Sequence, residues 1–142
     1  MKKIITYGTF DLFHYGHYNL LKRASELGDE LYVGISSDDM CLDKGKVTFL
    51  DQAKRLEIVS SLSFVTQTFI EHNMHQKVDD CKKYGIDVFV LGGDYRDIFP
   101  KMKEYGELIE GGVQVVFFDR TPEISSTDLK KRIILQSKLD EG

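Results

Sequence analysis

The segment Gly8-Thr9-Phe10-Asp11-Leu12-Phe13-His14-Tyr15-Gly16-His17 joins a predicted strand to a predicted helix, and this junction decides the fold. Residues 3–8 have the β-branched and aromatic content of a buried strand, whereas Leu20, Leu21 and Ala24 recur at helical spacing. The segment therefore follows the carboxyl end of a strand. Open parallel α/β sheets bind ligands at that end, and the N-terminus of the following helix attracts anions. We predict a nucleotide phosphate site here.

Two histidines lie one helical turn apart in this segment. His14 and His17 can face the same ligand because residues three apart share a side of a helix. Gly16 lies between them and lets a phosphate come close to the backbone. Two other interpretations stay open, namely a chance pair of capping or surface histidines and a metal site. Zinc on a helix more often uses a four-residue spacing, and it needs a third ligand that the neighbouring sequence does not clearly supply.

Strand-like and helix-like segments alternate along the whole chain, which is typical of a parallel sheet covered by helices. The predicted strands cover residues 3–8, 31–36, 64–70, 87–92 and 113–118. The predicted helices cover residues 15–28, 51–62, 75–84, 97–110 and 125–137. The pattern predicts a single-domain Rossmann-like α/β fold over residues 1–137, with a five-stranded parallel sheet and helices on both faces. We expect residues 138–142 to form a frayed C-terminal tail.

Several residues mark the expected ends of these elements. Gly28 and Gly85 fit the C-terminal caps of helices, and Asp51 fits an N-cap. The pair Gly111-Gly112 fits a turn before the last strand.

A long connection over residues 38–50 carries two lysines, Lys44 and Lys46. Long loops in compact domains are often functional or mobile. Beside a phosphate site, the two ammonium groups could close over a nucleotide and neutralise its charge. A flexible, solvated loop is the alternative.

The composition restricts the class of protein. The chain has 142 residues, of which 42% are hydrophobic and 30% charged, and its net charge is −4. This length gives one ordinary domain, and no apolar run is long enough to span a membrane. The negative charge argues against general nucleic-acid binding, which needs a basic face. No targeting segment is visible, so we expect a cytoplasmic protein. Cys41 and Cys81 lack metal-site spacing, which favours reduced thiols.

Two motifs carry a resemblance to a known family. Tyr7 through His17, followed by Leu27-Gly28-Asp29, resembles the HxGH signature of a nucleotidyltransferase superfamily. That superfamily includes cytidylyltransferases, adenylyltransferases of cofactor synthesis and class I aminoacyl-tRNA synthetases. A late segment, Arg120-Thr121-Pro122-Glu123-Ile124-Ser125-Ser126-Thr127, resembles the RTxGISTT signature. Together the motifs are most similar to those of the glycerol-3-phosphate cytidylyltransferase family, and the likeness extends over nearly the whole chain.

The resemblance implies an activity and its partners. It implies transfer of CMP from CTP to glycerol 3-phosphate, which releases pyrophosphate and gives CDP-glycerol for teichoic-acid or capsule polymers. It also implies Mg²⁺ bound mainly through the nucleotide phosphates, and a homodimer. Because the acceptor phosphate is already ionised near neutral pH, the reaction needs alignment and charge stabilisation more than a strong base. We expect both imidazoles to donate to the triphosphate, whose charge would favour their protonated forms.

The resemblance also implies roles for individual residues. The catalytic residues would be His14, His17, Lys44, Lys46 and Arg120. The nucleotide-binding residues would be Thr9, Phe10, Gly16, Asp94, Thr121, Ser125 and Thr127. The acceptor-binding residues would be Asp11, Arg55 and Tyr95.

Three places depart from the family pattern. Pro122-Glu123 stands where an acidic residue and glycine are usual, and Ser63 stands where an arginine is usual. Gly93 and Tyr95 stand where an acidic residue and tryptophan are usual, and the string Gly92-Gly93-Asp94-Tyr95 is similar to that of heptose-phosphate adenylyltransferases. An alternative is therefore a cytidylyl- or adenylyltransferase for another sugar, polyol or amino-alcohol phosphate. A nucleotide-binding regulator without turnover is a second alternative.

Overall fold

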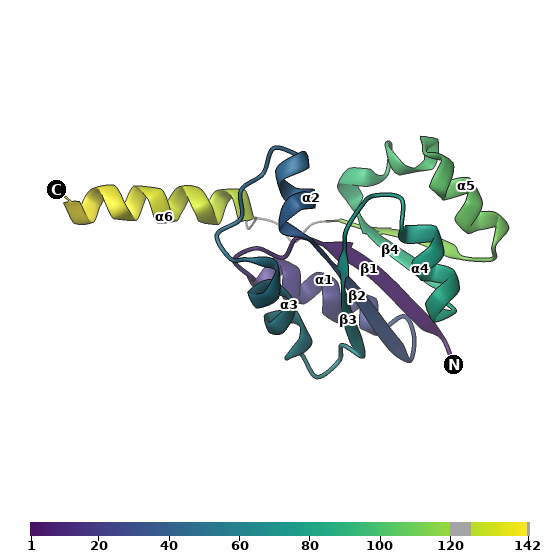
Figure 1. Ribbon diagram of the computed structural model, residues 1–142. Helices are drawn as coiled ribbons and strands as arrows, with labels where there is room; N and C mark the ends of the chain where they lie inside the picture. The colour runs from purple at the N-terminus through teal and green to yellow at the C-terminus, as the bar shows by residue number, and fades with distance from the viewer. Residues whose placement is uncertain (120–125, 142) are drawn as a thin grey trace.

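Five strands form one all-parallel sheet at the centre of the molecule (Figure 1). The computed structural model describes residues 1–119 and 126–141, with side chains described over residues 1–119 and 130–139. The strands are β1 (Lys3–Gly8), β2 (Glu30–Ser36), β3 (Gln67–Glu71), β4 (Val88–Gly92) and β5 (Gln114–Phe118). They lie in the order β3-β2-β1-β4-β5, which confirms the predicted five-stranded parallel sheet. The direction of winding changes between β1 and β4, and such a switch point is where ligands bind in this class of fold.

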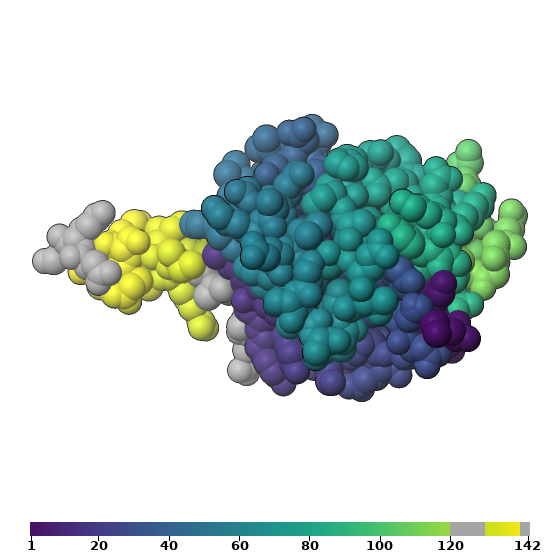
Figure 2. Space-filling model, turned by 60° about the horizontal axis from the view of Figure 1, so that its bottom comes forward, coloured from purple at the N-terminus to yellow at the C-terminus, as the bar shows by residue number. Residues whose placement is uncertain are grey.

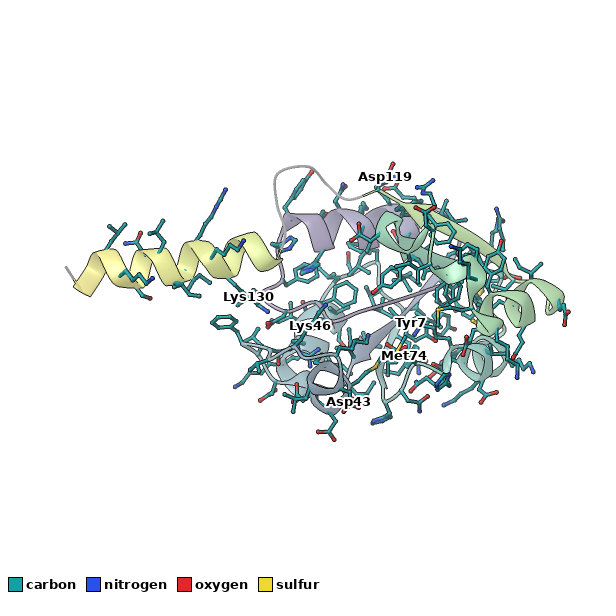
Figure 3. All side chains as sticks on the ribbon, turned by 90° about the horizontal axis from the view of Figure 1, so that it is seen from above. Tyr7, Asp43, Lys46, Met74, Asp119 and Lys130 are labelled. Carbon is teal, nitrogen blue, oxygen red and sulfur yellow. The ribbon has the colours of Figure 1, made fainter. Side chains whose placement is uncertain are left out.

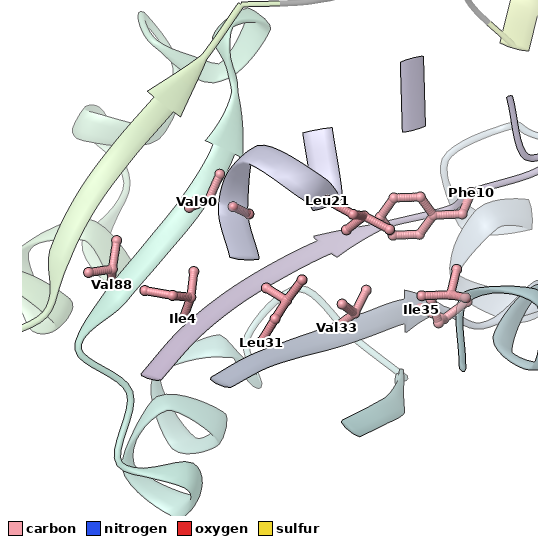
Figure 4. Close-up of a cluster of buried hydrophobic side chains, with 10 residues drawn as sticks. Ile4, Phe10, Leu21, Leu31, Val33, Ile35, Val88 and Val90 are labelled. Carbon is pink, nitrogen blue, oxygen red and sulfur yellow. The ribbon is translucent and has the colours of Figure 1, made fainter. Parts of the chain in front are cut away.

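Helices cover both faces of the sheet, as predicted. One face carries α1 (Tyr15–Ser25) and α3 (Gln52–Ser60), and the other carries α4 (Lys77–Tyr84) and α5 (Lys103–Glu110). Neighbouring residues of β1 serve the two layers because side chains alternate along a strand. Ile4 belongs to the cluster with Leu21 of α1 (Figure 4), whereas Ile5 belongs to the cluster with Val78 of α4 and Leu108 of α5.

Most predicted boundaries agree with the structure. Asp51 caps α3 by accepting a hydrogen bond from the Lys54 N–H, and Gly85 ends α4 in the left-handed region at φ 67°. Gly112 turns the chain before β5 at φ 86°. The C-cap of α1 is Glu26, so the prediction of Gly28 at that place is wrong.

Two segments differ from the predicted elements for identifiable reasons. β3 begins at Gln67 because Phe64 and Val65, predicted as strand residues, instead pack against the core from the preceding turn. Residues 93–101 form two short 3₁₀ helices, η1 (Gly93–Tyr95) and η2 (Phe99–Lys101), where the sequence predicts helix from residue 97. Pro100 lacks an N–H and disfavours a continuous α-helix, so α5 starts only at Lys103.

A further helix, α2 (Asp38–Asp43), occupies the first half of the connection that the sequence analysis treats as a loop. The Ser37 hydroxyl accepts a hydrogen bond from the Met40 N–H, and Asp38 and Asp39 stand in the first turn, where acidic residues favour a helix. The remaining connection before α3 therefore covers only residues 44–51.

The last helix, α6 (Ser126–Glu141), extends away from the rest of the molecule (Figures 1 and 2). It continues to Glu141, so residues 138–141 are helical where the sequence predicts a frayed tail. Across residues 1–119 and 126–141, the structure contains no helix with the length and apolar character needed to cross a membrane.

Candidate active site

A cavity of about 460 Å³ opens at the carboxyl ends of β1, β4 and β5. It lies at the switch point between β1 and β4, which is the position that the sequence predicts for a nucleotide. Its lining is formed by Tyr7, Gly8, Thr9, Phe10, Asp11, His14, Gly16, His17, Leu20, Arg23, Lys46, Val47, Thr48, Gly92, Asp94, Tyr95, Phe118, Asp119 and Lys130. The cavity therefore gathers segments that are far apart in the sequence.

The turn after β1 is held in an unusual backbone conformation. Phe10 and Leu12 both have left-handed φ values, 54° and 49°, which non-glycine residues rarely adopt. The Phe10 side chain is 3% exposed and packs in the core, with its ring 5.4 Å from the His17 ring. Phe10 thus lines the cavity where its binding to the nucleotide is predicted, and its buried ring packs against the His17 ring. Strained backbone conformations of this kind persist only where the surrounding structure holds them, and they cluster at functional sites.

His14 and His17 form a stacked pair at the start of α1. Their ring centroids are 3.9 Å apart with 18° between the planes. His14 is the N-cap and its Nδ1 accepts a hydrogen bond from the Gly16 N–H at 3.0 Å, while His17 Nδ1 accepts from the His14 N–H at 3.3 Å. Because each Nδ1 accepts, each neutral ring carries its proton on Nε2. The pair therefore offers two Nε2–H donors at the positive end of a helix.

The environment keeps both rings uncharged near neutral pH. Burial lowers the pKa of His14, and burial together with the charge of His14 lowers the pKa of His17 to about 4, although Asp11 opposes the shift. The protonated forms expected beside a triphosphate would therefore depend on the charge of the bound nucleotide. Neutral Nε2–H groups can still donate to phosphate oxygens, and Nδ1 protonation would break the capping bonds.

The two lysines of the predicted catalytic set separate in the structure. Lys46 lines the cavity, and its N–H bonds the Cys41 carbonyl across Gly45, which turns at φ 76°. Lys44 does not line this cavity. It lies close enough to Glu71 and Lys77 for their charges to act on it.

Lys77 is a residue that the sequence analysis misses. Its ammonium lies 2.5 Å from the buried Glu71 carboxylate and 5.0 Å from the centroid of the Tyr7 ring, which itself lines the cavity. Desolvation lowers the pKa of Lys44, Glu71 opposes this, and Lys77 adds to it. Two ammonium groups and one carboxylate thus meet beside the cavity. No local motif marks Lys77, because its neighbours come from β1, β3 and the α2 connection.

Arg55 has a different place from the one predicted. Its side chain is fully buried and does not line the cavity. The guanidinium donates to the carbonyl oxygens of Thr9, Ser36 and Leu50 and to the Asp38 carboxylate. These contacts correct the acceptor-binding prediction for Arg55, which instead ties the turn after β1 to β2 and to the start of α3.

Asp11 lines the cavity, but its carboxylate is 2% exposed and is engaged by the protein. It accepts hydrogen bonds from the N–H groups of Phe49 and Leu50, and Lys130 of α6 lies 2.9 Å away. Burial alone would raise the pKa of Asp11, but these donors hold it below its ordinary value. Asp11 thus joins protein segments at the cavity, and its contact with the acceptor stays a prediction.

Another wall of the cavity comes from the ends of β4 and β5, the residues that follow them, and Arg23 of α1. Asp94 and Tyr95 of η1 are exposed there, in agreement with their predicted place at the site. Asp119 accepts a hydrogen bond from Arg96 at 3.0 Å. The Arg23 guanidinium lies 4.3 Å from the centroid of the Phe118 ring. This wall presents carboxylates and a cation to a bound ligand.

The structure brings most of the predicted residues together. Those that line the cavity are Thr9, Phe10, Asp11, His14, Gly16, His17, Lys46, Asp94 and Tyr95. Arg120, Thr121 and Ser125 lie outside the described residues, and Thr127 lies in the first turn of α6 with its side chain outside them. Arg23, Lys77 and Lys130 are additions that only the three-dimensional arrangement reveals.

Comparisons with known proteins agree with this geometry. A family model described as cytidylyltransferase-like matches residues 5–132. The chain is 45% identical over 131 residues to a glycerol-3-phosphate cytidylyltransferase of Bacillus spizizenii. This alignment covers 92% of the chain and 96% of the relative. It is 39% identical to the enzyme of the same name from Staphylococcus aureus, over 94% of this chain and 96% of the relative. The solved structure of a lipopolysaccharide core biosynthesis protein from Thermoplasma volcanium GSS1 superposes with a TM-score of 0.73 at 27% identity, covering 85% of this chain and 98% of that one.

Proposed function

Because the chain belongs to the cytidylyltransferase-like family, we propose that it transfers the cytidylyl group of CTP to glycerol 3-phosphate, forming CDP-glycerol and pyrophosphate. The observation that carries the proposal is the stacked His14–His17 pair, which stands at a helix N-terminus in a cavity at the switch point of the sheet. CDP-glycerol would supply glycerol phosphate units to teichoic-acid or capsule polymers.

The reaction displaces pyrophosphate from the α-phosphorus of CTP. A phosphate oxygen of the acceptor forms the new bond, the bond from the α-phosphorus to the bridging oxygen breaks, and its electron pair leaves with pyrophosphate. Both partners are polyanions, so the protein contributes mainly by alignment and charge stabilisation. The Nε2–H groups of His14 and His17 would donate to phosphate oxygens, and Lys46 would neutralise charge from the facing loop.

We place the acceptor phosphate between Lys44 and Lys77. Glu71 now engages the Lys77 ammonium beside Tyr7, at the edge of the cavity. A dianionic phosphate would draw both ammonium groups, and Glu71 would limit the excess positive charge when the site is empty. One oxygen of that phosphate would then face the α-phosphorus of CTP in the cavity, and the glycerol hydroxyls would point away from it.

Magnesium would be held chiefly by the phosphate oxygens of CTP and by water. Among the residues that the structure describes, no group of three or more histidine, cysteine, aspartate or glutamate side chains could hold a metal ion. Asp94 and Asp119 line the cavity and could approach an ion carried by the nucleotide. When bound, the ion would neutralise the triphosphate and polarise its oxygens.

A homodimer is the assembly that the resemblance implies. Ile134, Leu135 and Leu139 of α6 are 52%, 59% and 65% exposed, which supports burial of this helix against a second copy. Sedimentation velocity at several protein concentrations measures the assembly directly.

The activity is tested by pyrophosphate release with magnesium. CTP and ATP are each paired with glycerol 3-phosphate and with sugar, heptose, choline and ethanolamine phosphates. Fast release only from CTP with glycerol 3-phosphate is the expected result. Release with another pair would assign a sibling specificity in agreement with the Gly93 and Tyr95 departures. Silence with every pair, in a protein that still binds CTP, would contradict an enzymatic role.

A further inference from the structure

The Asp11 carboxylate joins three segments that are distant in the sequence. Its Oδ2 accepts from the Phe49 N–H at 2.9 Å, and its Oδ1 accepts from the Leu50 N–H at 3.0 Å. The Lys130 ammonium lies 2.9 Å from Oδ2. The turn after β1, the loop before α3 and the start of α6 therefore meet on one buried side chain.

The backbone on both sides of Asp11 supports this arrangement. Phe10 and Leu12 adopt left-handed φ values, so the chain accepts strain immediately before and after the carboxylate. A conformation of this kind persists only where its surroundings hold it. The donors on Asp11 are part of those surroundings, because a buried carboxylate without partners is costly.

Lys130 stands at the border between this junction and the cavity. Its side chain is 27% exposed and lines the cavity, with the ammonium 5.4 Å from the centroid of the Phe49 ring. Figure 3 shows Lys130 reaching from α6 toward the part of the loop that carries Lys46, and both residues line the cavity. The contacts with Asp11 and Phe49 both hold α6 against this loop.

We propose that Lys130 is a positioning residue for nucleotidyl transfer, whose ion pair with Asp11 fixes the start of α6 to the loop that carries Lys46. The proposal rests on the proposed function, since it states what holds the start of α6 against the loop that carries Lys46 at the edge of the nucleotide cavity. Lys130 acts through Asp11 and the loop rather than by touching the nucleotide. With the pair intact, the loop is ordered before CTP arrives, so less of the binding energy is spent on ordering it.

The test compares Lys130→Met with Lys131→Met, which removes the same charge from an exposed neighbour on the same helix. Loss of the ion pair should raise the KM for CTP about tenfold, with a smaller change in kcat, as expected for one partly buried charge-assisted bond. Lys130→Arg should restore most of the loss because a guanidinium can still reach the carboxylate. Lys131→Met should behave like the unchanged protein.

Hydrogen exchange of the nucleotide-free protein supplies the second readout. If Lys130 positions the loop, Lys130→Met raises the exchange rate of the Phe49 and Leu50 amides, whereas Lys131→Met leaves it unchanged. A raised KM with unaltered exchange would mean direct contact with the nucleotide and would overturn the positioning role. Kinetics and exchange like those of Lys131→Met would also overturn it. If the unchanged protein turns over no substrate pair, the proposed function fails, while exchange still decides the role of the ion pair.

Discussion

Replacing Arg55 with methionine separates a role in the fold from a role in acceptor binding. The guanidinium is fully buried and donates to the carbonyl oxygens of Leu50, Thr9 and Ser36 at 3.0, 2.8 and 2.8 Å. It also bonds Asp38 Oδ1 at 2.8 Å. Methionine keeps much of the side-chain length but has no donor, so all four bonds are lost together.

The magnitude follows from these four contacts. A buried acceptor that loses its donor costs about 1–3 kcal/mol, and removing one partner of a buried ion pair costs about 3–5 kcal/mol. The Asp38 side chain is 40% exposed, so water recovers part of its loss. We therefore expect Arg55→Met to lower the free energy of unfolding by about 3–5 kcal/mol, chiefly because three carbonyl oxygens lose their donor at about 1–3 kcal/mol each. Arg55→Lys should cost about half as much, because one ammonium cannot reach all four acceptors.

Urea unfolding followed by circular dichroism measures these losses, and steady-state kinetics in the absence of urea measures the KM for glycerol 3-phosphate. The expected result is a large loss of stability for Arg55→Met and an intermediate loss for Arg55→Lys. Stability within about 1 kcal/mol of the unchanged protein for both variants, with a raised acceptor KM, would refute this reasoning. It would return Arg55 to the acceptor-binding role that the sequence predicts.

Three further predictions concern the histidine pair and the sheet. His17→Ala should reduce kcat at least about a hundredfold, as for one lost donor to transition-state charge, whereas the exposed His72→Ala should not; pyrophosphate release measures both. The pKa of His17 is about 4 in the folded protein and 6.5 ordinarily, so the unfolded chain takes up the proton first as the pH falls. The stability that neutral His17 contributes should be fully present above pH 6.5 and should be lost as the pH falls toward 4. The free energy of unfolding should therefore fall over this range by up to about 3 kcal/mol more than in His17→Ala. The same pH dependence of the urea midpoint in both proteins would argue against a lowered pKa of His17. Gly34→Ala should lower the free energy of unfolding by about 1–3 kcal/mol because its Cβ would lie 2.4 Å from Cδ2 of the Tyr7 ring, and a urea midpoint equal to that of the unchanged protein would show that the ring can move.

The sheet and the histidine pair could be predicted because their signals are local. The β-branched content of residues 3–8 indicates β1, and a spacing of three residues is enough to place His14 and His17 on one side of a helix. The helix α2 also had a local signal. Ser37 followed by Asp38 and Asp39 is a helix start, but only Met40 and Cys41 are buried behind it, so no apolar period accompanies the cap.

The roles of Arg55, Asp11 and Lys130 could not be predicted from local sequence. A single charged residue carries no mark of burial, and Arg55 becomes buried only when four segments converge on it. Asp11 meets Lys130 only after the chain has completed all five strands. The sequence identifies which chemical groups are present, whereas long-range packing decides which of them face the ligand.

The strand order has a consequence for the chain while it is being synthesised. β1 pairs with β2 soon after both are made, but its other neighbour is β4, and the Thr6 hydroxyl bonds the Val90 carbonyl 84 positions later. At about 5–20 residues per second, translation takes roughly 4–17 s to supply that neighbour. During this interval β1, the central strand of the finished sheet, has one unpaired edge, which can pair with a wrong strand. Until β4 and β5 are made, the cavity also lacks the wall that these strands provide. A bound nucleotide can therefore stabilise the sheet only after the exposed edge of β1 has paired with β4.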